Sequence, residues 1–238
     1  MSFNQYTLYN KSTKTNSNNT NMDIQHLLIM VLTMGIPLIF AITLHEAAHG
    51  FIAKLRGDNT AYNSGRVTLN PVPHIDPIGT LLIPGLMLLS SATVGMPFIF
   101  GWAKPVPVDY RNLKNPRVDS ALVALAGPVA NLLMAVIWAI VFTQVSFHPF
   151  IKSMAGYGVI INIVLMILNL LPIPPLDGSR IVTSFLSPTA AYKYNQYERY
   201  GFIILLALCI IPLGNSNILF YAISPIINTI ISLIFTII

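Results

Sequence analysis

The sequence predicts an all-α, polytopic membrane protein. Hydrophobic residues make up 54% of the 238-residue chain and charged residues only 9%, whereas a soluble domain carries about 25% charged residues. So few charges cannot cover a surface that faces water, and several apolar stretches are long enough to cross a bilayer. These observations exclude an ordinary soluble globule, a coiled coil and a disordered chain.

The single cysteine and the net charge of +5 exclude further kinds of site and partner. One cysteine forms neither an intramolecular disulfide framework nor a cysteine-based zinc cluster. We expect the basic excess to set the membrane topology, because the chain has no long run of Lys and Arg that would indicate nucleic-acid binding. The predicted surroundings are therefore a lipid bilayer, without nucleic acid as a partner.

The first elements follow from a change of composition near residue 23. Residues 1–22 are rich in Asn, Ser and Thr and contain no apolar run after a basic start, so they predict a disordered polar tail and not a signal peptide. Residues 23–238 form the predicted membrane domain. Its first apolar stretch, Ile24–Leu55, is longer than the roughly 20 residues that a membrane-spanning helix needs.

The apolar segment 78–100 is interrupted by Pro84-Gly85, Gly95 and Pro97, and predicts a broken span or a re-entrant hairpin. Basic residues flank it on both sides, which would place both flanks in the cytoplasm by the positive-inside rule and favours re-entry. The segment 101–108 alternates prolines with small and apolar residues and predicts extended chain, in the manner of an edge strand. The flanking basic residues are Lys54, Arg56 and Arg66 before the segment and Lys104, Arg111, Lys114 and Arg117 after it.

Three or four further spans are predicted towards the C-terminus, which gives about five or six membrane segments in all. The apolar stretches that predict them cover about residues 118–145, 157–171 with a second half to about 186, 200–213 and 218–238.

His45, Glu46 and His49 lie within the first predicted helix, in the order His-Glu-Ala-Ala-His. Positions four apart share a helix face, so both imidazoles can bind one metal ion. Glu46 lies beside the first ligand and can accept the proton of an attacking water, as a zinc hydrolase requires. The alternative is a polar cluster satisfied by neighbouring helices, but these residue types are costly in a membrane helix unless they are paired or bind metal.

Asp177 is the best candidate for a third ligand, because catalytic zinc usually has three protein ligands and one open position. The prolines at 172, 174 and 175 break the helix just before it, and Gly178 allows a close backbone approach. Broken helices at membrane depth line cavities or are buried in protein. The alternative reading of Asp177 is a helix N-cap after a proline-rich turn.

Together, these motifs resemble the site-2 protease family of intramembrane zinc proteases, and in particular its compact bacterial branch. The resemblance covers about residues 23–238, and the order of the motifs is more specific than the zinc motif alone. Besides the two zinc-site motifs, the runs that carry it are Asn70-Pro71, His74-Ile75-Asp76-Pro77-Ile78-Gly79-Thr80, the segment 101–108 and Ala126-Gly127-Pro128-Val129-Ala130-Asn131.

The resemblance implies one Zn²⁺ per chain, held by His45, His49 and Asp177, with Glu46 as the general base. Asn169 lies eight residues before Asp177, which is the family's spacing for an asparagine near the metal. It would hold the substrate backbone or the developing oxyanion; a helix–helix hydrogen bond is the alternative.

Two further positions need comment. Asn131, after Gly127-Pro128, is assigned a packing role first and a substrate contact second. The family often has a second glycine after the aspartate, and Ser179 stands there in this chain, where a small residue is expected to fit.

The resemblance also implies the reaction and its setting. It implies regulated intramembrane proteolysis, the hydrolysis of a peptide bond in a transmembrane segment of a membrane protein. The active site would lie within the cell membrane, towards the cytoplasmic side of a multi-pass chain. The sequence identifies no regulatory membrane partner and contains no inserted peptide-binding domain, so substrate choice would rest on the membrane part or on partners.

Two other functions remain open from the sequence. An inactive relative would bind membrane segments without cutting them, although the intact Glu46 argues against this. A metal transporter would need several spaced intramembrane carboxylates or histidines along a path, whereas the sequence has one cluster.

Overall fold

The structure is a computed structural model that describes residues 24–82, 103–145, 147–214 and 216–238. The predicted tail, residues 1–22, lies outside these residues, and so does most of the segment 78–100. The regular elements of the described part are helices and one two-stranded hairpin, which agrees with the predicted all-α class.

Four of the described helices are long and apolar enough to cross a membrane. Two of them start with proline at the first helical position. Proline is tolerated there because an N–H at this position would make no hydrogen bond within the helix. The four are α2 (Ile24–Leu55), α5 (Pro116–Gln144), α6 (Pro149–Leu170) and α10 (Ile218–Ile237).

Shorter elements connect these helices. Asp76 accepts hydrogen bonds from the N–H groups of Ile78 and Gly79 and so starts the turns that follow it. The short elements are α3 (Thr60–Asn63), η1 (Val72–His74), η2 (Pro77–Leu82), η3 (Tyr110–Asn112), α7 (Asp177–Phe185), α8 (Pro188–Asn195), α9 (Glu198–Ile210), β1 (Pro212–Leu213) and β2 (Ser216–Asn217).

The structure differs from the sequence prediction at two elements. The stretch 200–213, expected to span, forms α9, whose 13 residues extend about 20 Å and fall short of a hydrocarbon core of about 30 Å. The chain then turns back through Gly214, which has a positive φ of 61°. Residues 103–108 form no strand, because Pro105 and Pro107 have no N–H to donate to a ladder.

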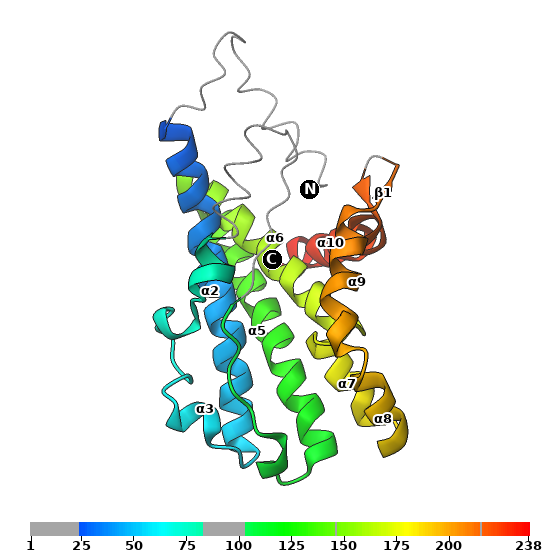
Figure 1. The fold of residues 1–238 in the computed structure, drawn as a ribbon. Helices are drawn as coiled ribbons and strands as arrows, with labels where there is room; N and C mark the ends of the chain where they lie inside the picture. The colour runs from blue at the N-terminus through cyan, green and yellow to red at the C-terminus, as the bar shows by residue number, and fades with distance from the viewer. Residues whose placement is uncertain (1–23, 83–102, 146, 215) are drawn as a thin grey trace.

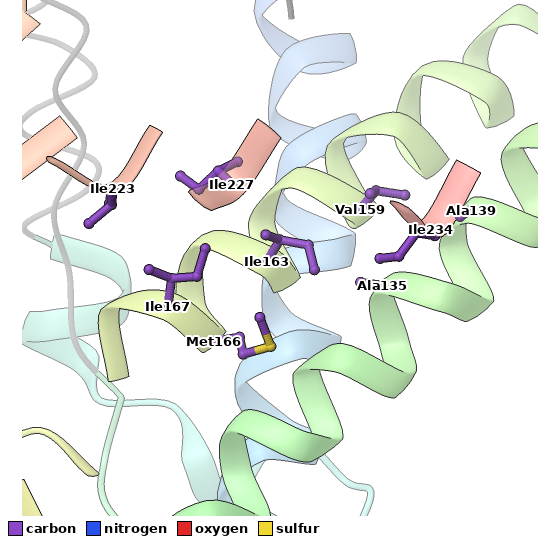
Figure 2. Packing of buried hydrophobic residues seen from close by; sticks show 9 residues of the cluster. All are labelled: Ala135, Ala139, Val159, Ile163, Met166, Ile167, Ile223, Ile227 and Ile234. Atoms are coloured by element: carbon purple, nitrogen blue, oxygen red, sulfur yellow. The ribbon is translucent and has the colours of Figure 1, made fainter. Parts of the chain in front are cut away.

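Helices α2, α5 and α6 pack side by side and form the centre of the molecule (Figure 1). Small side chains allow the close packing; Gly158 of α6, for example, faces the Trp138 indole of α5, which a Cβ at this position would overlap. Figure 2 shows the main apolar cluster, to which α5, α6 and α10 contribute. Its members are Ala135, Ala139, Val159, Ile163, Met166, Ile167, Ile223, Ile227 and Ile234.

Polar contacts join the helices at one end of the bundle, which we call the basic end because Lys54, Arg56, Lys114 and Arg117 lie there. Arg56, just after α2, donates to the fully buried Asp119 of α5 at 2.6 Å. Arg117 of α5 donates to the carbonyl oxygen of Leu186, just after α7, at 2.7 Å. The end of α2, the start of α5 and the end of α7 therefore meet at one level.

Asp58 organises the loops at the basic end. Its fully buried carboxylate accepts hydrogen bonds from Thr60, from the Asn112 side chain and from the N–H of Asp109. Burial opposes its ionisation, but these hydrogen bonds together outweigh burial and lower the pKa of Asp58 below its ordinary value. The charge therefore contributes to stability.

We predict that Asp58→Ala lowers the free energy of unfolding by about 2 kcal/mol or more, because it leaves several buried hydrogen-bond donors without an acceptor. The folded-state pKa lies below the unfolded value of about 3.9, so the contribution is complete above that value and is lost as the pH falls through the folded pKa. Thermal unfolding in detergent from pH 7 to pH 3 measures the difference, which should shrink on acidification. Asp109→Ala removes an ion pair with the exposed Arg111 and the hydrogen bond from the Arg111 N–H to the Asp109 carboxylate, and should cost less stability; an equal loss there would contradict the assignment.

Candidate metal centre

Helix α2 presents His45 and His49 on one face, one turn apart. Both side chains are buried, and their ring centroids lie 4.6 Å apart with the ring planes nearly perpendicular, at 83°. The predicted i, i+4 pairing is therefore present inside the bundle.

The break after α6 brings Asp177 to these histidines. Helix α6 ends at Leu170, and α7 starts at Asp177, whose Oδ2 lies 3.2 Å from Nε2 of His45 and 3.3 Å from Nε2 of His49. Gly178 is required here, because a Cβ would overlap the carbonyl oxygens of Leu170 and Leu171.

Two later elements hold the same break in place. The hydroxyl of Tyr194, on α8, donates to the carbonyl oxygen of Pro172 at 2.7 Å. Gly201, on α9, packs so closely on the carbonyl of Pro174 that a Cβ would overlap it. The arm that carries Asp177 is thus held by the C-terminal half of the chain.

Hydrogen bonds fix the tautomer of both histidines. Nδ1 of His49 lies 2.7 Å from the carbonyl oxygen of Val123, which can only accept, so Nδ1 donates. Nδ1 of His45 lies 2.5 Å from Oδ1 of Asn131, and the Asn131 amide nitrogen donates to Ala41 and Asn162, so this Nδ1 also donates. Both neutral rings therefore turn an Nε2 lone pair towards Asp177.

Three acceptor atoms converge where no donor is present. Oδ2 of Asp177 is buried and has no hydrogen-bond partner, and it faces two Nε2 atoms that carry no proton in these tautomers. The ligand atoms of the three residues lie within 4.8 Å of one another. Acceptors so arranged repel one another unless a cation lies between them, and two imidazoles with one carboxylate suit Zn²⁺.

Gly127 of α5 forms the wall of this site. A Cβ at residue 127 would lie 2.5 Å from Nε2 of His45 and 2.5 Å from Nε2 of His49. Only glycine leaves the two ligand atoms accessible on this side.

A buried chain of amides supports His45. The Asn162 side chain donates to the carbonyl oxygen of Gly158 at 2.8 Å and accepts from Asn131 at 3.0 Å, and both amides are fully buried. Asn131 thereby orients the His45 ring. Its side-chain amide makes all its hydrogen bonds to other residues of the protein. The sequence analysis did not identify Asn162. Its polar side chain in an apolar helix could have indicated a role, because it lies seven residues before Asn169 and so on the same helix face.

Glu46 is half-buried beside the first ligand. Its Oε2 accepts a hydrogen bond of 2.8 Å from the main-chain N–H of Val106. The carboxylate is therefore held by the extended chain that returns to α2 after the segment 83–102.

The structure does not bring Asn169 or His74 into the metal group. Asn169 donates to the carbonyl oxygen of Leu165 in its own helix at 3.0 Å, and its predicted contact with substrate stays a prediction. His74 is fully buried, with Nε2 3.3 Å from the carbonyl oxygen of Thr68.

The fold and the site together define a metallopeptidase of the HExxH type with membrane helices. Comparison with known proteins supplies the family: the model of peptidase family M50 matches residues 150–212, which include Asp177. The candidate zinc metalloprotease YwhC of Bacillus subtilis is 40% identical over 204 residues, or 81% of this chain and 84% of YwhC.

A second relative agrees. The candidate zinc metalloprotease Rip2 of Mycolicibacterium smegmatis is 30% identical over 181 residues, or 74% of this chain and 66% of Rip2. No solved structure shows a significant match. The chain belongs to peptidase family M50 and is a zinc metalloprotease of the site-2 protease type, with its His-His-Asp metal site intact.

We predict that Gly127→Ala weakens zinc binding by about a hundredfold or more, because disturbing the partners of metal ligands alone typically costs about 10- to 100-fold. Zinc content after dialysis against a competing chelator measures the change. Gly35→Ala is the matched control, since a Cβ at this position of α2 meets nothing within 4 Å. Equal zinc retention in both variants would show that Gly127 does not shape the site.

Proposed function

We propose that the protein is an intramembrane endopeptidase that uses one zinc ion to hydrolyse peptide bonds within transmembrane segments of membrane proteins. The observation that carries this proposal is the convergence of His45, His49 and Asp177 inside a bundle of membrane-length helices, with Glu46 beside them. A protease with its ligands on such a helix acts on chains that enter the bilayer.

The position of the ligands along α2 supports a site near the cytoplasmic side. His49 lies five residues before Lys54, or about 8 Å along a helix. Lys54 belongs to the basic end of the bundle, which the positive-inside rule assigns to the cytoplasm. Under this assignment the metal lies inside the cell membrane, below its cytoplasmic surface.

The chemistry divides among the residues of the site. Zinc, when bound, polarises the scissile carbonyl and lowers the pKa of water. Glu46 takes the proton from the attacking water and delivers it to the leaving amine. Asn169, at the end of α6, would donate to the substrate backbone or to the oxyanion once a substrate segment replaces its present intrahelical contact.

A metal transporter is the competing function. It would require further groups of ligands along a path, whereas the described residues contain one such group, His45, His49 and Asp177. The Val106 hydrogen bond that holds Glu46 beside the ligands also favours hydrolysis, because transport requires no oriented base.

We also propose that the segment 78–100 re-enters the membrane and does not cross it, which makes five membrane segments with the four long helices, and α9 is a further, partial one. The described chain on its two sides supports this. The N–H of Lys104 donates to the carbonyl oxygen of His74 at 3.0 Å, and the N–H of Asp109 donates to Asp58 at 2.9 Å. Chain that leaves and returns beside itself fits entry and exit at one surface.

We predict that Glu46→Gln keeps its zinc and loses proteolysis. Glutamine still accepts a hydrogen bond but cannot take the water proton, and loss of a general base costs about 10²–10⁴-fold in rate. Quantitative proteomics of membrane-protein fragments from cells with wild-type or Glu46→Gln protein measures cleavage, and metal analysis of the purified variant measures zinc. Identical fragment levels, with zinc bound in both proteins, would remove Glu46 from the mechanism.

We predict that single cysteines at Asn63 and Arg111 both react with an impermeant maleimide only after the cell membrane is opened. Both positions are exposed, and the native Cys209 is first replaced by Ala. A cysteine at Phe147, which is 83% exposed between α5 and α6, should react in intact cells. Labelling of Asn63 and Arg111 from opposite sides would show that the segment 78–100 crosses the membrane.

A further inference from the structure

The chain that holds Glu46, Lys104-Pro105-Val106-Pro107, has an unusual backbone, and we call it the strap. Each proline restricts the residue before it to extended conformations, so Lys104 and Val106 are both extended. Prolines also have no N–H. Val106 therefore offers the one main-chain donor among residues 105–107, and this donor points at Oε2 of Glu46 at 2.8 Å.

Arg66 holds the strap through its carbonyl groups. Nη2 of Arg66 donates to the carbonyl oxygen of Lys104 at 2.6 Å and to that of Pro105 at 3.1 Å. Arg66 is only 7% exposed, and its own N–H is fixed to the carbonyl oxygen of Ala61 at 2.9 Å. The peptide groups directly before Val106 are therefore bound to a buried cation.

The strap also lies directly on α2. Gly50, four residues after Glu46, makes room for it, because a Cβ there would lie 3.2 Å from Val106 Cγ1 and 2.9 Å from Val67 Cγ2. On the other edge, the N–H of Lys104 donates to the carbonyl oxygen of His74. Arg66 thus holds the carbonyl groups of the strap, and the His74 carbonyl holds the Lys104 N–H. These contacts leave the Val106 N–H little freedom to move.

We propose that Arg66 is a positioning residue for the general base and acts through the strap. The proposal rests on the proposed function, in which Glu46 is the base. A glutamate side chain has several rotatable bonds, and the single donor of Val106 selects one orientation of the carboxylate, next to the first metal ligand in the chain. Without the guanidinium, two carbonyl groups lose their donor, the strap shifts, and Glu46 loses its fixed orientation.

Hydrogen–deuterium exchange on the zinc-loaded, full-length protein tests the contact without a substrate. Arg66→Met should speed exchange of the Val106 amide at least about tenfold, while the Asp109 amide, bound to Asp58 in the same stretch of chain, keeps its protection. Arg66→Lys, which can still donate to one carbonyl group, should give an intermediate rate. Arg111→Met is the matched control, because that side chain is 90% exposed, and it should change neither amide.

Turnover gives the second measurement. The probe is a reconstituted membrane protein that wild type cleaves, and Glu46→Gln is assayed on it beside wild type. Arg66→Met should keep one zinc per chain and a KM close to that of wild type, with kcat lower by about 10- to 100-fold, as a misplaced catalytic group costs. Arg66→Lys should recover part of kcat.

The outcomes separate the two proposals. Unchanged Val106 exchange in Arg66→Met, or unchanged kcat with Glu46→Gln inactive, would overturn the role of Arg66 alone. Loss of zinc and of Asp109 protection together with that of Val106 would make Arg66 merely structural and would also overturn it. Full activity of Glu46→Gln would instead remove Glu46 from the mechanism, and absence of cleavage by wild type would overturn the proposed function, whatever the exchange rates are.

Discussion

Three lone pairs that face one another inside a helical bundle govern the rest of this structure. An unpaired buried acceptor costs about 1–3 kcal/mol, and here a carboxylate oxygen faces two imidazole nitrogens that are acceptors in the neutral tautomers selected by the Nδ1 hydrogen bonds. A metal cation between these atoms relieves their repulsion. The Val123 carbonyl and the Asn131 amide, both on α5, and the Pro-rich break between α6 and α7 all serve this one convergence.

Much of the site could be predicted from local sequence because helix geometry is local. His45 and His49 are four apart, so one turn of helix determines their shared face, and the prolines before Asp177 mark a break wherever they occur. The prediction of Asp177 needed one further step, since its approach to the histidines depends on how α6 and α7 pack against α2. The usual number of zinc ligands and the proline-broken helix identified Asp177 as the candidate, and the family resemblance agreed.

The contacts that the sequence did not predict are those between segments far apart in the chain. Nothing near Gly127 indicates that it touches two histidines of α2, and nothing near Arg66 indicates that it binds the carbonyl groups of Lys104 and Pro105. The expected span over residues 200–213 failed for a related reason. Its hydropathy suits a membrane, but α9 ends after 13 residues at a hairpin, and hydropathy contains no information on where a helix stops.

The placement of the third ligand gives the metal a mechanical role. His45 and His49 belong to the first helix, whereas Asp177 is held by contacts from Tyr194 and Gly201 in the C-terminal half. A bound ion therefore closes a very long loop of chain, as a disulfide would, and such closure mainly restricts the disordered states that compete with the fold. The ion that makes the site reactive would thus also join the first helix to the C-terminal half of the bundle, and its departure would remove that cross-link.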